Sequence, residues 1–173
     1  MATETLTTPF AANEDPRKGT YTPTLIASLF SRFLGAIALH IEAERDIQDV
    51  DVWDAAFTGW LREAEESLKV VKTFLRQIRD AQVVRASDVP LLRLAILADA
   101  LIRSADAGDF QRACGLLTHP TLFRCVETGP VGRRVAAMVK TAVLRLDELA
   151  DLDTYAPDSF PHTPADVVPG SVA

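Results

Sequence analysis

The sequence predicts an all-α fold, a bundle of four long helices with a short helical pair. Three observations support this prediction. Prolines leave the stretches 24–89, 91–119 and 131–156 uninterrupted, and long helices can run there. Apolar residues in these stretches recur every three or four positions, which is the helical period. No segment shows the alternation of apolar and polar residues that marks a half-buried strand.

The first helix is predicted over about 22–45, with Thr22 as the N-cap and Pro23 at the first helical position. Small residues line one side of it, at Ser28, Ser31, Gly35 and Ala38. The stretch 23–41 is almost as long as a membrane-spanning helix, but Arg32 at its centre would cost about 2.5–3.5 kcal/mol in a bilayer. We therefore expect a buried helix of a soluble protein, without a membrane partner.

The second helix is predicted over about 51–81. Its apolar residues step by three and four positions and form one seam, which comprises Trp53, Phe57, Trp60, Ala64, Leu68, Val71, Leu75 and Ile78. Such a long apolar seam must be buried against other apolar residues along its whole length. We therefore expect a homodimer in which this helix contributes to the interface.

The third helix is predicted over 88–107, with Ser87 or Asp88 as the cap and Gly108 as the stop. It is apolar on nearly all sides, which places it at the centre of the bundle. A short helical pair follows over 109–127, and a last helix over about 130–152. The bundle is expected to form a single domain over 22–153, with a flexible arm at 1–21 and a proline-rich disordered tail at 154–173. Within the tail, Phe160 is the residue that would anchor it if it docked.

Composition restricts the class of protein. Apolar residues make up 48% of the chain, and the net charge of −6 argues against nucleic-acid binding by the molecule as a whole. The first ten residues have neither the positive start of a secretory signal nor the acid-poor composition of a mitochondrial presequence. We expect a cytoplasmic protein with its two cysteines, Cys114 and Cys125, reduced.

Charge is segregated along the chain. Residues 1–70 hold 12 acidic and 6 basic residues, residues 71–145 hold 6 and 12, and residues 146–173 hold 6 acidic residues and no base. Four acids crowd the end of the last helix, at Asp147, Glu148, Asp151 and Asp153, where the helix dipole is already negative. We expect arginines of the middle segment to pair with this end, namely Arg76, Arg79, Arg85, Arg93, Arg103, Arg112, Arg124, Arg133 and Arg134.

No familiar catalytic motif is present: the chain has no phosphate-binding loop, no GxSxG and no HExxH. His40 and Glu44 share a helix face, and we interpret them as a partly exposed structural pair. Cys114, His119 and Cys125 match no common zinc spacing, so neither a metal nor a cofactor is predicted.

The sequence favours a non-enzymatic protein-interaction module, such as an adaptor, accessory subunit or regulator. The arginines Arg76, Arg79, Arg124, Arg133 and Arg134 are the candidate contacts for an acidic protein partner. One alternative is a small-molecule pocket at Trp53, Phe57 and Trp60, although such a stripe more often belongs to the core. Another is an enzyme with a dispersed site. A helical-repeat protein is a weaker possibility, because 94–117 resembles half of a tetratricopeptide unit but the repeat period is absent.

Overall fold

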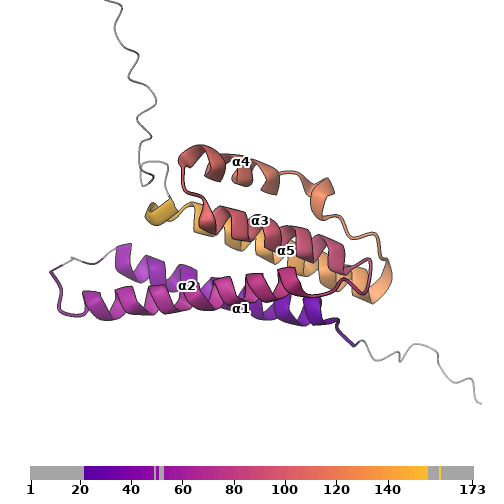
Figure 1. The fold of residues 1–173 in the computed structure, drawn as a ribbon, viewed down its shortest axis with the longest axis horizontal. Coiled ribbons are helices and arrows are strands. Elements are labelled where there is room, and N and C mark those ends of the chain that lie inside the picture. Colours follow the sequence, from indigo (N-terminus) through magenta and orange to yellow (C-terminus); the bar gives the residue numbers. More distant parts are fainter. Residues whose placement is uncertain (1–21, 49, 51–52, 156–159, 161–173) are drawn as a thin grey trace, which may run out of the picture.

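The fold is described from a computed structural model, which places residues 22–48, 50, 53–155 and 160. These residues form helices and no strand, and the all-α prediction is thereby confirmed (Figure 1). The elements are α1 (Leu25–Gln48), α2 (Phe57–Asp80), α3 (Asp88–Arg103), α4 (Ala107–Leu117), the 3-10 turn η1 (Pro120–Phe123), α5 (Gly129–Ala150) and the 3-10 turn η2 (Asp153–Tyr155). The N-terminal arm 1–21 and the tail beyond Phe160 lie outside the described residues.

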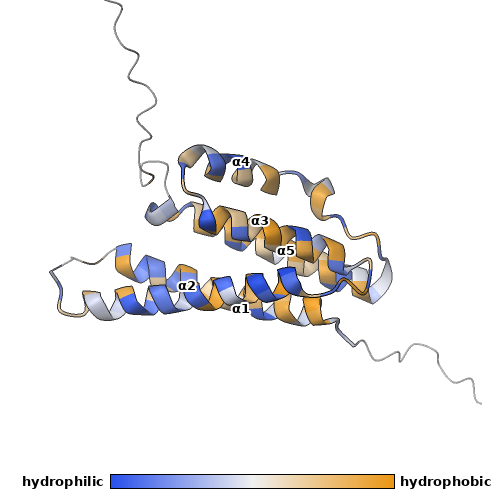
Figure 2. Cartoon of the chain, viewed as in Figure 1, coloured by the Kyte–Doolittle hydropathy of each residue, from blue (hydrophilic) through white to orange (hydrophobic). Residues whose placement is uncertain are grey.

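Helix α3 lies at the centre of the fold. It contacts α1, α2, α4, α5 and η1, as expected for a helix that is apolar on most sides. Helices α1 and α2 form an antiparallel hairpin and pack chiefly on each other, while α4 and η1 cover the outer side of α3 (Figure 1). Hydrophobic residues dominate α3, whereas the outward side of α2 is largely hydrophilic (Figure 2).

The core is built mainly from α1, α3 and α5. Phe30 and Phe33 of α1 are fully buried and meet edge to face, with ring centroids 5.4 Å apart. Helix α1 is the one helix in the described part of the chain that is long and apolar enough to cross a membrane, with a mean hydropathy of 1.5. Its apolar side is occupied by α2, α3 and α5, and Arg32 is exposed on the opposite side.

The small residues of α1 face outward rather than toward a neighbouring helix. Ser31 and Gly35 are exposed, and a Cβ atom added at Gly35 would have nothing within 4 Å. The stripe therefore does not mediate close packing within the chain.

Three helix ends differ from the sequence prediction. Helix α1 begins at Leu25 because the Thr24 hydroxyl, rather than that of Thr22, accepts the hydrogen bond from the Ala27 amide at 3.1 Å. Helix α2 begins at Phe57, so Trp53 precedes it, and the Asp54 carboxylate binds the Ala56 amide at 2.8 Å. Helix α3 ends at Arg103.

Gly108, the predicted stop of the third helix, instead lies inside α4. That helix begins where the Asp106 carboxylate accepts the Asp109 amide at 2.8 Å. The same bond lowers the pKa of Asp106 below its ordinary value. A capping aspartate thus starts a new helix here, and this local interaction outweighs the tendency of Gly108 to end one.

Part of the predicted disordered tail packs on the bundle. Tyr155 is buried and stacks on Phe110 of α4 at a centroid separation of 6.0 Å, and the Thr154 hydroxyl donates to Glu44 of α1 at 2.7 Å. Phe160 also contacts Phe110, at 5.5 Å between centroids. Residues 154, 155 and 160 were assigned to the disordered tail by the sequence, and their contacts correct this. Tyr155 belongs to the core, Phe160 packs against it, and the exposed Thr154 binds α1.

A buried carboxylate joins the start of α1 to the start of α3. Asp88 is 1% exposed and accepts three hydrogen bonds, from the Thr24 hydroxyl at 2.5 Å and from the Val84 and Arg85 amides at 3.0 Å each. The side chain therefore satisfies donors that the α2–α3 connection would otherwise leave unpaired.

We expect Asp88→Ala to destabilise the protein by about 2–4 kcal/mol, because it removes the shared acceptor of three part-buried hydrogen bonds. Urea unfolding followed by circular dichroism measures this change. Asp80→Ala is the matched control, since Asp80 is exposed and its pairing with Arg79 is long, at 3.8 Å. Equal effects of the two substitutions would contradict the role given to Asp88.

Candidate functional site

The predicted partner-binding arginines divide into two groups in the structure. Arg124, which precedes α5, and Arg133, on its first turns, line one hollow beside the start of that helix. Arg134 is the next residue of α5 and does not line the hollow. Arg76 and Arg79 lie on α2, away from it. The structure therefore brings together two of the five candidates.

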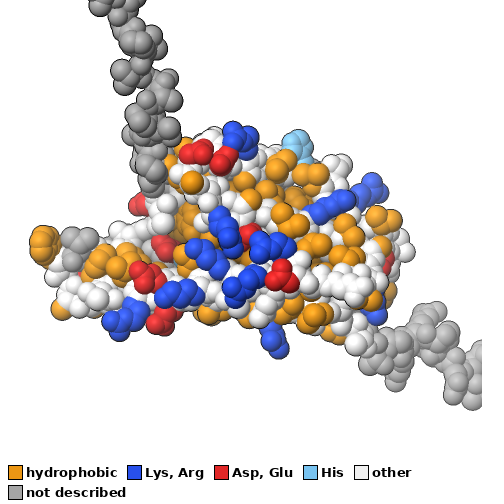
Figure 3. Space-filling model, viewed as in Figure 1, with side chains coloured by type: hydrophobic (Ala, Val, Ile, Leu, Met, Phe, Trp, Pro, Cys, Tyr) orange, Lys and Arg blue, Asp and Glu red, His pale blue; other side chains and the backbone are white. Residues whose placement is uncertain are grey.

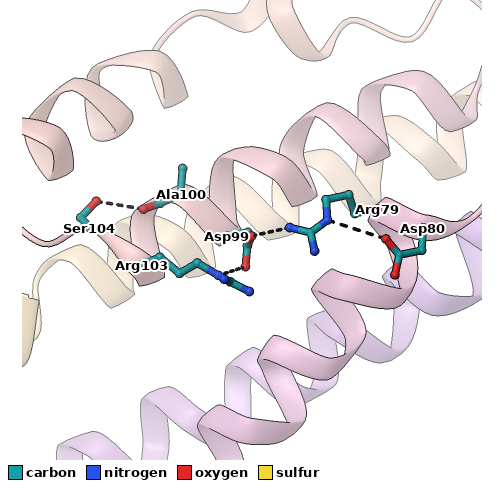
Figure 4. Close-up of polar contacts among 6 residues, drawn as sticks. All are labelled: Arg79, Asp80, Asp99, Ala100, Arg103 and Ser104. Carbon is teal, nitrogen blue, oxygen red and sulfur yellow. Dashed lines mark hydrogen bonds and ion pairs between the residues drawn. The ribbon is translucent and has the colours of Figure 1, made fainter.

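Arg79 takes part in a contact that holds α2 against α3 (Figure 4). Its guanidinium lies 3.2 Å from Asp99 of α3, and Asp99 also binds Arg103 at 2.7 Å. Asp99 is mostly buried. Its ion pairs with Arg79 and Arg103 are therefore stronger than an ion pair between two exposed side chains. Arg79 thus has a structural partner within the chain.

The hollow beside α5 has a volume of about 730 Å³ and an apolar floor with a polar rim. Phe123, Cys125, Ala136 and Val139 supply apolar atoms. The polar lining comes from the segment 121–129 and from one side of α5, and consists of Thr121, Arg124, Glu127, Thr128, Arg133 and Lys140.

Two glycines shape this hollow. A Cβ atom at Gly132 would lie 1.9 Å from the carbonyl oxygen of Glu127, so only glycine lets the segment before α5 cross its first turn this closely. Gly129 has a φ of +82°, a left-handed conformation that turns the chain into α5. Gly132 has no role in the sequence prediction, because no motif in the chain marks this close approach of its backbone to Glu127.

Three cations at this hollow have no ion-pair partner among the residues that the structure describes: Arg124, Arg133 and Lys140. The start of α5 adds the positive end of its helix dipole to their charge. Lys140 was not a sequence candidate. Its spacing of seven residues from Arg133, two helical turns, is the signal that could have found it.

Two smaller hollows extend this surface across α3 and α4. One, of about 290 Å³, shares Phe123 with the first and is otherwise lined by Arg93, Ile96, Leu97, Ala100, Leu116 and Leu122. The next, of about 460 Å³, shares Leu97, Ala100 and Leu116 and reaches Arg103 and Arg112. We call the three connected hollows the cationic furrow.

The cationic furrow combines apolar surface with positive charge. Six Lys or Arg residues line it against two carboxylates, Asp109 and Glu127, and Asp109 already pairs with Arg112. Ile96 and Leu116 on its floor are 50% and 45% exposed. Figure 3 shows hydrophobic side chains over α3 and α4 with Lys and Arg gathered beside them.

The acidic end of α5 is paired differently from the sequence prediction. Glu148 lies 2.7 Å from Arg145 on the same helix and 3.8 Å from Arg45 of α1, and neither arginine was in the predicted set. Asp147 is partly buried and close to Asp151, and both effects raise its pKa. Glu148 is thus neutralised by Arg145, the last residue of the basic middle segment, and by Arg45 of the acidic first segment.

The three aromatic candidates do not assemble into a pocket. Trp53 is 89% exposed and precedes α2, while Phe57 and Trp60 are half-buried on its first turn. None of the three lines the hollows described here. The apolar seam of α2 is buried from Ala64 onward, where α2 packs on α1. This part of the seam is therefore buried by the chain itself and not by a second copy.

His40 lies fully buried between α1 and α2, which corrects the prediction of a partly exposed residue. The Ser67 hydroxyl donates to the Ala64 carbonyl at 2.7 Å, so it accepts from Nδ1–H of His40 at 3.1 Å. Nε2 has no hydrogen-bond partner among the residues that the structure describes, and it faces Glu44 at 3.9 Å. Burial lowers the pKa of His40, and Lys72 adds to this, against the opposing effect of Glu44.

The cysteines are free and half-buried. Burial raises the pKa of Cys114, with a contribution from nearby Asp147. Burial likewise raises the pKa of Tyr155, which lies near Glu44. Among the described residues, no group of three or more His, Cys, Asp or Glu side chains is placed to hold a metal ion.

Comparison with known proteins gave no relative of this chain: no family model, curated protein or solved structure matches it significantly.

We expect Gly132→Ala to destabilise the protein by about 1–3 kcal/mol, because the added Cβ must displace the backbone at Glu127. Thermal unfolding measures this change. Gly35→Ala is the control, since the space beside it is open, and it should be neutral or stabilising by about 0.4–1 kcal/mol. If Gly132→Ala were as well tolerated as Gly35→Ala, the close approach of the Glu127 backbone to Gly132 would be absent in solution.

Stability should fall as the pH drops below about 6.5, the ordinary pKa of histidine. The lowered pKa of His40 means that the unfolded chain takes up a proton in this range before the folded chain does. His40→Leu should reduce this loss, measured by urea unfolding at pH values on both sides of 6.5. The exposed His119 provides the control His119→Gln, which should leave the pH dependence unchanged.

Proposed function

We propose that this protein is a non-enzymatic interaction module that binds an acidic, apolar-containing segment of a protein in its cationic furrow. The observation that carries the proposal is the hollow beside α5, where an open apolar floor is bordered by Arg124, Arg133 and Lys140, none of them paired within the described chain. Exposed apolar surface with unpaired charge of one sign is typical of a docking surface.

The chemistry of the furrow defines what it accepts. Apolar side chains of a partner would cover Cys125, Ala136 and Val139, and its carboxylates would meet the cations at the rim. Arginine forms paired hydrogen bonds with carboxylates, which gives such a contact orientation as well as attraction. The partner is therefore a segment with acidic residues beside apolar ones.

The test uses a synthetic helical peptide with Leu along one face and Glu on the other, and a second peptide with Lys in place of Glu. We expect the acidic peptide alone to bind, and Arg124→Glu with Arg133→Glu to weaken its binding at least about tenfold, or about 1.4 kcal/mol. Binding should also weaken as salt rises, because exposed charges are screened over about 8–10 Å. Fluorescence anisotropy of the labelled peptide measures both effects.

The matched control is Arg32→Glu with Arg62→Glu, which makes the same change in net charge at exposed residues away from the furrow. It should leave peptide binding close to that of the wild type. If both double variants weakened binding equally, only the net charge would matter. Equal binding of the acidic and basic peptides would overturn the proposal.

A further inference from the structure

The α1–α2 hairpin extends past the rest of the bundle. The end of α1 and the start of α2 lie beyond α3 and α5, at one end of the long axis of the molecule (Figure 1). The start of α5, with the largest hollow of the cationic furrow, lies at the opposite end. The hairpin is thus free to contact another molecule.

The surface of this hairpin is acidic, whereas the charged residues of the cationic furrow are mainly Lys and Arg. Helices α1 and α2 together present four carboxylates around a shallow hollow of about 300 Å³, with no Lys or Arg in its lining: Glu42, Asp46, Glu63 and Glu66. None of the four has an ion-pair partner within the described residues. Leu39 and Val70 stand among them and are 63% and 48% exposed.

We propose that the acidic hairpin of a second copy of this chain occupies the cationic furrow. The inference rests on the proposed function, and names the partner for it. Unpaired carboxylates beside exposed apolar residues on one copy are complementary to unpaired cations around an apolar floor on the other. The charges need no third component to be neutralised.

The positions of the two surfaces favour a closed pair. Because the hairpin and the largest hollow of the furrow lie at opposite ends of the long axis, a two-fold axis perpendicular to it sets two copies side by side and antiparallel (Figure 1). Each hairpin then lies at the furrow of the other copy, so that both contacts form at once. A typical stable interface buries about 1,200–2,000 Å² in total, and each of two equal contacts need supply only half of it.

The experiment measures molar mass by light scattering at micromolar concentration and low salt. The wild type is expected to have twice the mass of one chain, and to approach that of one chain as salt is raised. A furrow variant, Arg124→Glu with Arg133→Glu, and a hairpin variant, Glu63→Lys with Glu66→Lys, should each be monomeric. Mixed in equal amounts they should form a heterodimer, because one intact furrow then meets one intact hairpin.

Circular dichroism shows whether each variant is folded, and a variant that is not is replaced by its alanine counterpart, Arg124→Ala with Arg133→Ala or Glu63→Ala with Glu66→Ala. A monomeric wild type at low salt would overturn the inference, as would a dimer that survived either pair of substitutions, or a mixture that stayed monomeric. If the acidic peptide bound the furrow of a monomeric wild type, self-docking would be wrong and the proposed function would stand. Failure of the peptide to bind a monomeric wild type would remove both.

Discussion

The need to bury α3 organises this protein. Helix α3 is apolar on most of its circumference, and the other α-helices and η1 all pack against it. Every turn of it that lacks a neighbour leaves apolar atoms in water, at a cost of about 25 cal/mol per Å². The α1–α2 hairpin and α5 cover two sides along most of its length. The third side is left to α4, which has only 11 residues, and to the single turn η1.

The cationic furrow is a consequence of that incomplete cover. Where α4 and η1 end, Ile96, Leu116 and Leu122 remain partly exposed, and the same gap opens toward the start of α5. The segment that leads into α5 borders this gap and crosses the first turn of that helix at Gly132. The floor of the furrow is thus the part of the core that the short elements leave uncovered.

Positive charge serves two purposes in this molecule. Arg79 and Arg103 both bind Asp99 and hold α2 against α3, and Arg45 and Arg145 bind Glu148 at the end of α5. Arg124, Arg133 and Lys140 bind no carboxylate of the described chain. The unpaired acids of the α1–α2 hairpin lie at the other end of the molecule, too distant to pair with them within one chain. This separation supports contact between molecules rather than within one.

The sequence by itself determined the helical class, the burial of α3 and most of the core, because the apolar period of a helix is local and can be read along the chain. It also made Arg124 and Arg133 candidate contacts, since charge segregation is a property of composition. Tertiary structure decided the rest. The arginine pairs that join two helices, Arg79 with Asp99 and Arg45 with Glu148, and the part of the seam of α2 that is buried depend on contacts between residues far apart in sequence. The furrow itself depends on Gly132 and Lys140, whose importance comes from what the fold places beside them.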